Sequence, residues 1–183
     1  MALKSTVFKA ELQIADIDRD YYHEHALTLA RHPSETDERL MVRLLAFALN
    51  ASESLSFGRG LSTEDEPDLW QKDLTGAIEL WIDVGLPDEK AIRKACGRAQ
   101  QVKVYSYGGR AAALWWEQAR DRFERAGNLA VIDLPAEATR AMAALAQRNM
   151  RLQCTIQDGL VWLDNGEGTA QVQPVTRTGP GAG

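Results

Sequence analysis

The sequence has few of the features that mark zinc-binding, secreted or membrane-spanning proteins. Its two cysteines, Cys96 and Cys154, stand far apart, and no CxxC pair or His/Cys cluster accompanies them, so a zinc site is not expected. The N-terminal stretch has no long apolar segment and no cleavage signature, which argues against a signal peptide. No apolar run approaches the roughly 20 residues that a membrane helix needs. These absences predict a cytoplasmic protein with free thiols and no membrane partner.

Excess positive charge is also missing. The chain has 21 Lys and Arg against 26 Asp and Glu, a net charge of −5, which argues against broad electrostatic binding of nucleic acid but leaves a local basic patch open. No Walker loop, GxGxxG or Ser/His/Asp order is present. With 183 residues, of which 45% are apolar, the chain is long enough for one domain with a sizeable core.

The spacing of apolar residues predicts an alternation of strands and helices. Apolar residues alternate over 8–17, and after a turn at 16–20 a second strand over 21–30 completes an antiparallel hairpin. Ser34 with Asp37 resembles a capping box that opens a helix. The other expected elements are a loop over 56–68, strands over 77–84, 102–107 and 129–134, helices over 87–100, 111–126 and 136–148, and an AspGly hairpin over 151–163.

This order predicts an α/β fold with a mixed β-sheet flanked by helices. The strand–helix–strand units between 77 and 134 are expected to be right-handed crossovers between parallel strands. Neither a linker nor an internal repeat is evident, so residues 1–183 are expected to form a single domain. The stretch 165–183 is rich in Gly, Thr and Pro, which predicts a flexible tail.

An acidic strand is the strongest candidate for chemistry. Within IELWIDVG, Glu79 and Asp83 fall on the same face as Trp81, because strand side chains alternate, and Asp68 lies just upstream. Carboxylates on a central strand are expected to be solvated, paired or bound to a cation. Three acids suit Mg²⁺, which could activate water for phosphodiester hydrolysis. The alternative is a solvated face whose acids pair with Arg or Lys.

Two helices carry further charged candidates. Lys94 and Arg98 lie four residues apart on the helix after the acidic strand, so they share a face and could orient a phosphate. Glu38 lies in the first turn of the helix that begins near Ser34, where the helix dipole favours an acid. For both sets, the alternative is an ordinary solvated helix surface.

Four long segments resemble the YaeQ family of bacterial proteins. They are LTLARHPSETDERLMVRLLAFAL, EDEPDLW, IELWIDVGLPDEKAIRKAC and LQCTIQDGLVWL, and the resemblance covers nearly the full chain. It implies a compact variant of the restriction-endonuclease-like PD-(D/E)xK fold with added β-hairpins and a magnesium-type site. It also implies a context in transcription elongation.

The resemblance implies roles for individual residues. Glu38 corresponds to the acid on the first core helix, and Pro67–Asp68 is a literal PD, with Asp73 as the alternative. The (D/E)xK element aligns with Asp83-Val84-Gly85, so a glycine stands at the lysine position. Lys94 could supply that cation from the next helix.

Two functions follow from the resemblance. The first is a Mg²⁺- or Mn²⁺-dependent nuclease-like protein with catalytic Glu38, Asp68, Asp83 and Lys94, in which Asp68, Glu79 and Asp83 bind the metal. The second is a non-catalytic module of the same fold that binds nucleic acid or protein, with the transcription machinery as a partner.

Overall fold

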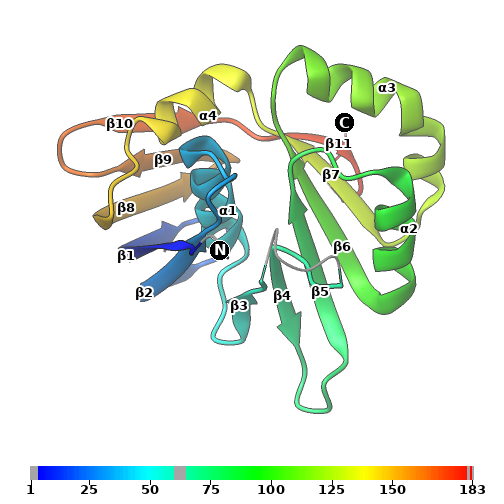
Figure 1. Cartoon of the computed structure of the whole chain (residues 1–183), viewed down its shortest axis with the longest axis horizontal. Helices are drawn as coiled ribbons and strands as arrows, with labels where there is room; N and C mark the ends of the chain where they lie inside the picture. The colour runs from blue at the N-terminus through cyan, green and yellow to red at the C-terminus, as the bar shows by residue number, and fades with distance from the viewer. Residues whose placement is uncertain (1–3, 60–64, 181, 183) are drawn as a thin grey trace. The chain divides into compact units, whose positions relative to one another are not determined.

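The computed structural model describes residues 4–59, 65–180 and 182. Within them, two mixed β-sheets are flanked by four helices. The chain divides into two compact units, each with its own sheet (Figure 1). Unit 1 comprises Met1–Leu49 and Glu137–Gln173, and unit 2 comprises Asn50–Ala136 and Pro174–Gly183. None of the helices in the described part of the chain is both long and apolar enough to cross a membrane.

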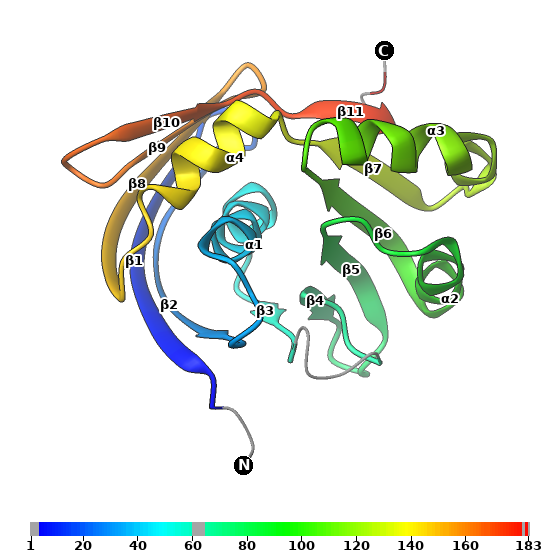
Figure 2. The ribbon, with the colours of Figure 1, turned by 45° about the horizontal axis from the view of Figure 1, so that its top comes forward.

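Unit 1 is a five-stranded sheet that curves around one helix, as Figure 2 shows. The sheet order is β10-β9-β8-β1-β2, in which β1 and β8 are parallel and the other neighbours are antiparallel. Alternate residues of β1 are buried, as an amphipathic strand requires. The elements are β1 (Thr6–Asp16), β2 (Tyr21–Arg31), α1 (Asp37–Asn50), α4 (Ala136–Ala143), β8 (Asn149–Gln157), β9 (Leu160–Asp164) and β10 (Thr169–Val172).

Unit 2 is built on a six-stranded sheet of order β11-β7-β6-β5-β4-β3. Its central strands β5, β6 and β7 are parallel, which requires the crossover helices α2 and α3 between them. The elements are β3 (Leu55–Phe57), β4 (Leu69–Lys72), β5 (Ile78–Val84), α2 (Glu89–Arg98), β6 (Ala99–Ser106), α3 (Arg110–Arg125), β7 (Leu129–Asp133) and β11 (Val175–Thr178).

Both crossover helices of unit 2 cover the same face of its sheet. One hydrophobic cluster joins Ile92 of α2 and Trp116 of α3 to Trp81, Val102 and Val131 of the three parallel strands. This packing decides which side chains of β5 face the helices, because Trp81 and the residues two positions away share its side of the strand.

Several expected elements are confirmed. The β1–β2 hairpin pairs in continuous antiparallel register. The predicted AspGly turn joins β8 to β9, with Asp158 at φ 53° and Gly159 at φ 75°, the positive values that a type I′ turn needs. The parallel order predicted between 77 and 134 is also observed.

Other expectations need correction. Thr36, not Ser34, caps α1, since its hydroxyl accepts from the Arg39 amide at 3.1 Å while the Ser34 hydroxyl contacts His32. The fourth predicted helix ends at Ala143 rather than 148. The stretch 165–183, predicted to be a flexible tail, contains β10 and β11. The first pairs with the preceding strand β9, and the second pairs with β7, which is distant in the sequence and which local composition does not reveal. Part of the predicted loop, 60–64, lies outside the described residues.

Candidate acidic site on β4 and β5

The pairing of β4 with β5 ends one residue short of two carboxylates. The antiparallel register matches Leu69 with Ile82 and Trp70 with Trp81. Continuing this register by one residue puts Asp68 opposite Asp83, on the face that Trp81 also occupies. Directly opposed residues of an antiparallel pair have Cβ atoms roughly 5 Å apart, so in this extended register the two carboxylates would be close enough for one small cation.

Each carboxylate of this pair is held by a neutral donor from β5. The backbone amide of Val84 donates to Asp68 Oδ2 at 2.9 Å, and the indole Nε1 of Trp81 donates to Asp83 Oδ2 at 2.9 Å. Asp68 is only 4% exposed, whereas Asp83 is half-buried. The pair therefore has one deep and one accessible oxygen acceptor, both with fixed orientation.

A close backbone approach holds the segment that carries Asp68. Gly58 donates its amide to the Asp68 carbonyl at 2.9 Å. A Cβ atom at Gly58 would lie 2.1 Å from the carbonyl oxygen of Pro67, a distance that no real contact has. The end of β3 can therefore approach Pro67–Asp68 only because residue 58 is glycine.

Two tryptophan rings connect the acidic pair to two cationic side chains. The Trp70 and Trp81 rings meet edge to face, with centroids 6.1 Å apart. The Lys72 ammonium lies 3.7 Å from the Trp70 centroid, and the Arg98 guanidinium lies 5.1 Å from the Trp81 centroid. Since Trp81 also binds Asp83, Arg98 of α2 is one aromatic ring away from the carboxylates.

Glu79 does not join Asp68 and Asp83. The β4–β5 register steps from Gln71↔Leu80 to Lys72↔Ile78, which makes Glu79 the extra residue of a β-bulge. Its carboxylate accepts from Gln71 Nε2 at 3.3 Å. Four residues along a strand span about 13 Å, so Glu79 lies well away from Asp83.

Lys94 is exposed and already ion-paired. Its ammonium lies 3.2 Å from Asp65 Oδ1, and its side chain is 62% exposed. The Arg98 guanidinium donates to the carbonyl of the same Asp65 at 3.0 Å. Both basic residues are thereby tied to the chain three residues before Asp68.

The glycine at the position where the predicted motif has a lysine has a structural cause. Gly85 has a φ of +98°, and its amide donates to the Tyr105 carbonyl at 2.9 Å. A lysine would be strained in this backbone conformation. The chain leaves β5 through a turn that favours glycine, and so a lysine could not stand here without cost.

The remaining predicted acids have partners of their own. Glu38 belongs to unit 1, where it accepts from the Thr139 hydroxyl of α4 at 3.1 Å. Asp73 closes the β4–β5 turn by accepting from Thr75 and Ala77 amides, and the Thr75 hydroxyl bond holds the pKa of Asp73 below its usual value. That role in the turn separates Asp73 from the PD position.

The described residues contain no group of three or more His, Cys, Asp or Glu side chains arranged to hold a metal ion. An acidic pair is still sufficient for Mg²⁺, which retains several waters and takes one or two protein carboxylates. The residues that fit such an ion are Asp68 and Asp83.

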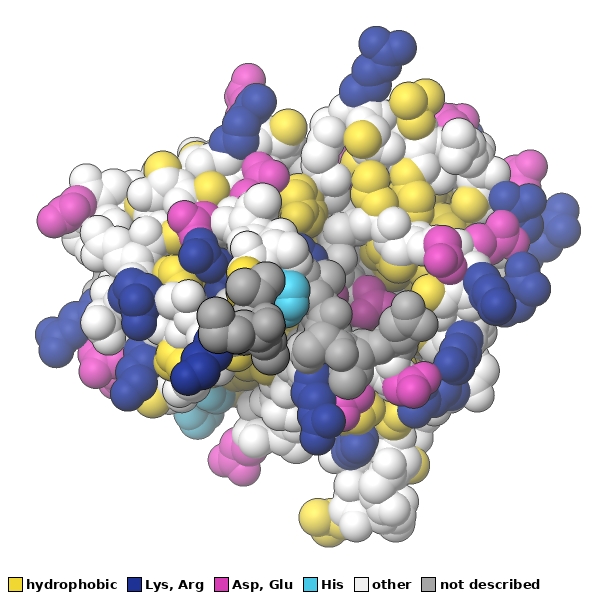
Figure 3. Space-filling view, in the orientation of Figure 1, with side chains coloured by type: hydrophobic (Ala, Val, Ile, Leu, Met, Phe, Trp, Pro, Cys, Tyr) yellow, Lys and Arg dark blue, Asp and Glu magenta, His cyan; other side chains and the backbone are white. Residues whose placement is uncertain are grey.

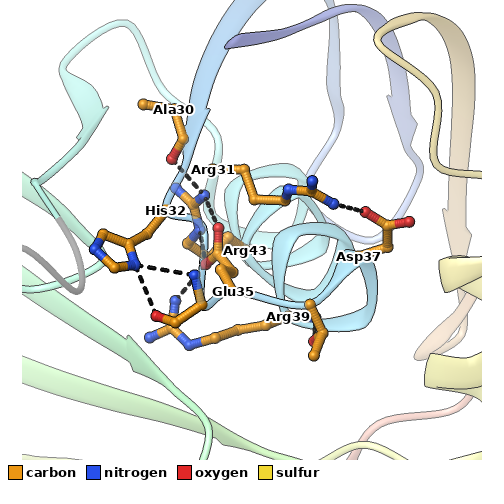
Figure 4. Close-up of polar contacts among 9 residues, drawn as sticks. Ala30, Arg31, His32, Glu35, Asp37, Arg39 and Arg43 are labelled. Atoms are coloured by element: carbon orange, nitrogen blue, oxygen red, sulfur yellow. Dashed lines mark hydrogen bonds and ion pairs between the residues drawn. The ribbon is translucent and has the colours of Figure 1, made fainter. Parts of the chain in front are cut away.

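Two polar clusters were not predicted from the sequence. In unit 2, Lys103 Nζ donates to Asn50 Oδ1 at 2.7 Å, and Asn50 Nδ2 donates to the Tyr105 hydroxyl at 2.8 Å. In unit 1, buried Glu35 accepts from Arg43 at 2.6 and 3.0 Å and from Arg39 at 2.6 Å (Figure 4). The i, i+4 spacing of Glu35 and Arg39 was the available signal for the second cluster.

A family model and the sequences of known proteins both relate this chain to YaeQ proteins. A family model described as "YaeQ protein" matches residues 1–174. Uncharacterized YaeQ proteins of Salmonella typhi and Escherichia coli K12 are 47% identical over 173 residues and 46% identical over 172 residues. These matches cover 94% of this chain and 96% and 95% of the relatives.

Two crystal structures are similar over almost their whole length. The YaeQ protein of Xanthomonas axonopodis pv. citri has a TM-score of 0.94 at 55% identity, covering 96% of this chain and 99% of that one. The YaeQ protein of Pseudomonas syringae has a TM-score of 0.91 at 35% identity, covering 96% and 97%.

Proposed function

The chain belongs to the YaeQ family, and from that premise we propose that it is a Mg²⁺-dependent, nuclease-like protein with a restriction-endonuclease-like PD-(D/E)xK core. Its substrate is a nucleic acid phosphodiester. The observation that supports this proposal is the β4–β5 register, which, extended by one residue beyond Leu69↔Ile82, puts Asp68 opposite Asp83. Like charges directly opposite on a strand pair repel each other, so a bound divalent cation would stabilise this arrangement.

A Mg²⁺ ion held by the pair would act as a Lewis acid that activates water and stabilises charge on the leaving oxygen. The protein contributes orientation: Val84 fixes Asp68, and Trp81 fixes Asp83. Arg98 stacks on the same Trp81 and offers a planar set of donors suited to a phosphate.

Two residues, Lys94 and Arg98, are candidates for the cation that faces the phosphate. Lys94 would have to leave Asp65 to approach the pair, whereas Arg98 is already in contact with Trp81. We therefore favour Arg98 as the phosphate-facing cation and keep Lys94 and Glu38 as predicted catalytic residues. Glu79, held by Gln71, would act outside the metal's coordination sphere.

A second function, a non-catalytic module that binds nucleic acid or protein near the transcription machinery, is favoured by one observation. Gly85 has a backbone conformation that disfavours the lysine of the motif. Without an ammonium at this position, the attacking water loses its usual orienting group. Binding without turnover would then be the retained activity.

Titration with Mn²⁺ by calorimetry tests the metal site. Asp83→Asn removes the charge but keeps an oxygen that can accept from Trp81. We expect saturable binding by the wild type and an affinity at least about tenfold lower in the variant, or about 1.4 kcal/mol. Asp121→Asn, at an exposed position of α3, removes the same charge elsewhere in unit 2 and should leave the affinity unchanged.

Absence of saturable binding in the wild type, or equal affinity in Asp83→Asn, would contradict the metal site. With binding established, incubation of the Mn²⁺-loaded protein with labelled DNA and RNA separates the two functions. Products that are lost in Asp83→Asn support the nuclease. Metal binding without products supports the non-catalytic module.

A further inference from the structure

Charge is strongly segregated along unit 2. Residues 50–89 contain ten Asp or Glu and two Lys or Arg, whereas residues 90–125 contain three Asp or Glu and nine Lys or Arg. The second stretch includes nearly all of α2 and the whole of α3. A chain with a net charge of −5 thus has a strongly basic helical layer.

Helix α2 displays its basic residues on one arc. Ile92 and Ala95 are buried against the sheet. On the opposite arc lie the exposed residues Lys90, Arg93, Lys94 and Arg98. At 3.6 residues per turn, positions 90, 94 and 98 follow one another along the helix, and position 93 lies beside them.

The end of α3 extends this basic surface. Arg122 lies 2.8 Å from Glu89, the acid in the first turn of α2, and Glu89 also pairs with Arg93 at 3.2 Å. One carboxylate is therefore shared by two guanidinium groups from adjacent helices. Exposed Arg125 follows Arg122 by three residues on α3, so both lie on the same side of that helix.

We propose that Lys90, Arg93, Lys94, Arg98, Arg122 and Arg125, here called the α2–α3 basic surface, bind the phosphate backbone of a nucleic acid. Lys and Arg side chains gather over α2 and the end of α3 at the right of Figure 3. Four of the six residues are arginines, whose planar donors match phosphate oxygens. A duplex carries a negative charge roughly every 1.7 Å, so the roughly 15 Å length of α2 spans several phosphates.

The position of this surface links it to the acidic pair. Arg98 belongs to the surface and also stacks on Trp81, the donor to Asp83. A backbone bound along α2 would thus bring a phosphodiester toward Asp68 and Asp83. This link rests on the proposed function, but binding to the basic surface itself needs no metal.

Fluorescence anisotropy with a labelled duplex of about 20 base pairs, in EDTA, isolates backbone binding from the metal site. The test variant combines Lys90→Glu with Arg93→Glu. The control combines Lys9→Glu with Arg151→Glu, an equal charge change on exposed strand positions of unit 1. We expect the test variant to bind at least about tenfold more weakly. The slope of its log K against log salt concentration should also become less steep by about two.

The control variant should retain both affinity and slope. Equal losses in the two variants would make the effect one of net charge and would overturn the proposal. Failure of the wild type to bind at about 50 mM salt would do the same. Tighter binding of a polyglutamate of equal charge would assign the surface to an acidic protein instead. Because EDTA removes metal, binding here together with failed Mn²⁺ titration would overturn the proposed function alone.

Discussion

The buried carboxylates of the two units differ in the charge of the side chains placed next to them. In unit 1, Glu35 is surrounded by two arginines: its side chain is 2% exposed and that of Arg43 is 4% exposed. In unit 2, the nearly buried Asp68 accepts from the Val84 amide, and extending the β4–β5 register by one residue puts a second carboxylate, Asp83, opposite it. The first arrangement is electrostatically complete within the protein. In the second, the proposed cation would neutralise both carboxylates, which would distinguish a binding site from a structural ion pair.

Removing the arginine of unit 1 should have the largest effect. Arg43→Met keeps the bulk of the side chain but withdraws the bidentate partner of buried Glu35. We expect a loss of about 3 kcal/mol in the free energy of unfolding, measured by urea denaturation. Arg151→Met, whose side chain is 88% exposed, should change it by less than about 0.5 kcal/mol. Similar losses at both positions would remove the contrast between the units.

An intermediate effect is expected from the backbone approach that holds Asp68. In Gly58→Ala the added methyl group would collide with the Pro67 carbonyl, so β3 must shift. The expected loss is about 1–3 kcal/mol, together with weaker Mn²⁺ binding. The matched change Gly97→Ala, in α2 with nothing within 4 Å of the new methyl group, should stabilise the protein by about 0.5–1 kcal/mol. If Gly58→Ala left metal affinity intact, the Asp68 assignment would lose its support.

The smallest effect concerns a histidine of unit 1. Burial and then the nearby His23 lower the pKa of His25 from its ordinary value of 6.5, while its ring contacts Phe47 and the Tyr21 hydroxyl. The unfolded chain therefore binds a proton more readily than the folded one. Stability should be full above pH 6.5 and should fall as the pH drops toward the lowered pKa. His25→Gln should flatten this slope in thermal melts; identical slopes would contradict the assignment.

Features set by local sequence could be predicted. The alternation of β1, the helix that follows Ser34 and the AspGly turn depend on neighbouring residues, and all three are confirmed. The carboxylate face of β5 was only partly predictable. Its alternation puts Asp83 beside Trp81, but the bulge that separates Glu79 arises from pairing with β4. The stacking of Arg98 on Trp81 depends on how α2 packs, which no spacing within α2 reveals.

The parallel pairing of β1 with β8 joins Lys9 to Asn149. Such distant partners are costly to bring together, and they slow folding. As the chain is synthesised, the β1–β2 hairpin emerges first but obtains its second neighbour only after residue 149. The parallel strands and crossover helices of unit 2, complete by residue 133, emerge in between. The earliest segment to leave the ribosome therefore waits for its second neighbour until the parallel strands of unit 2 have emerged, and its open edge is exposed throughout that interval.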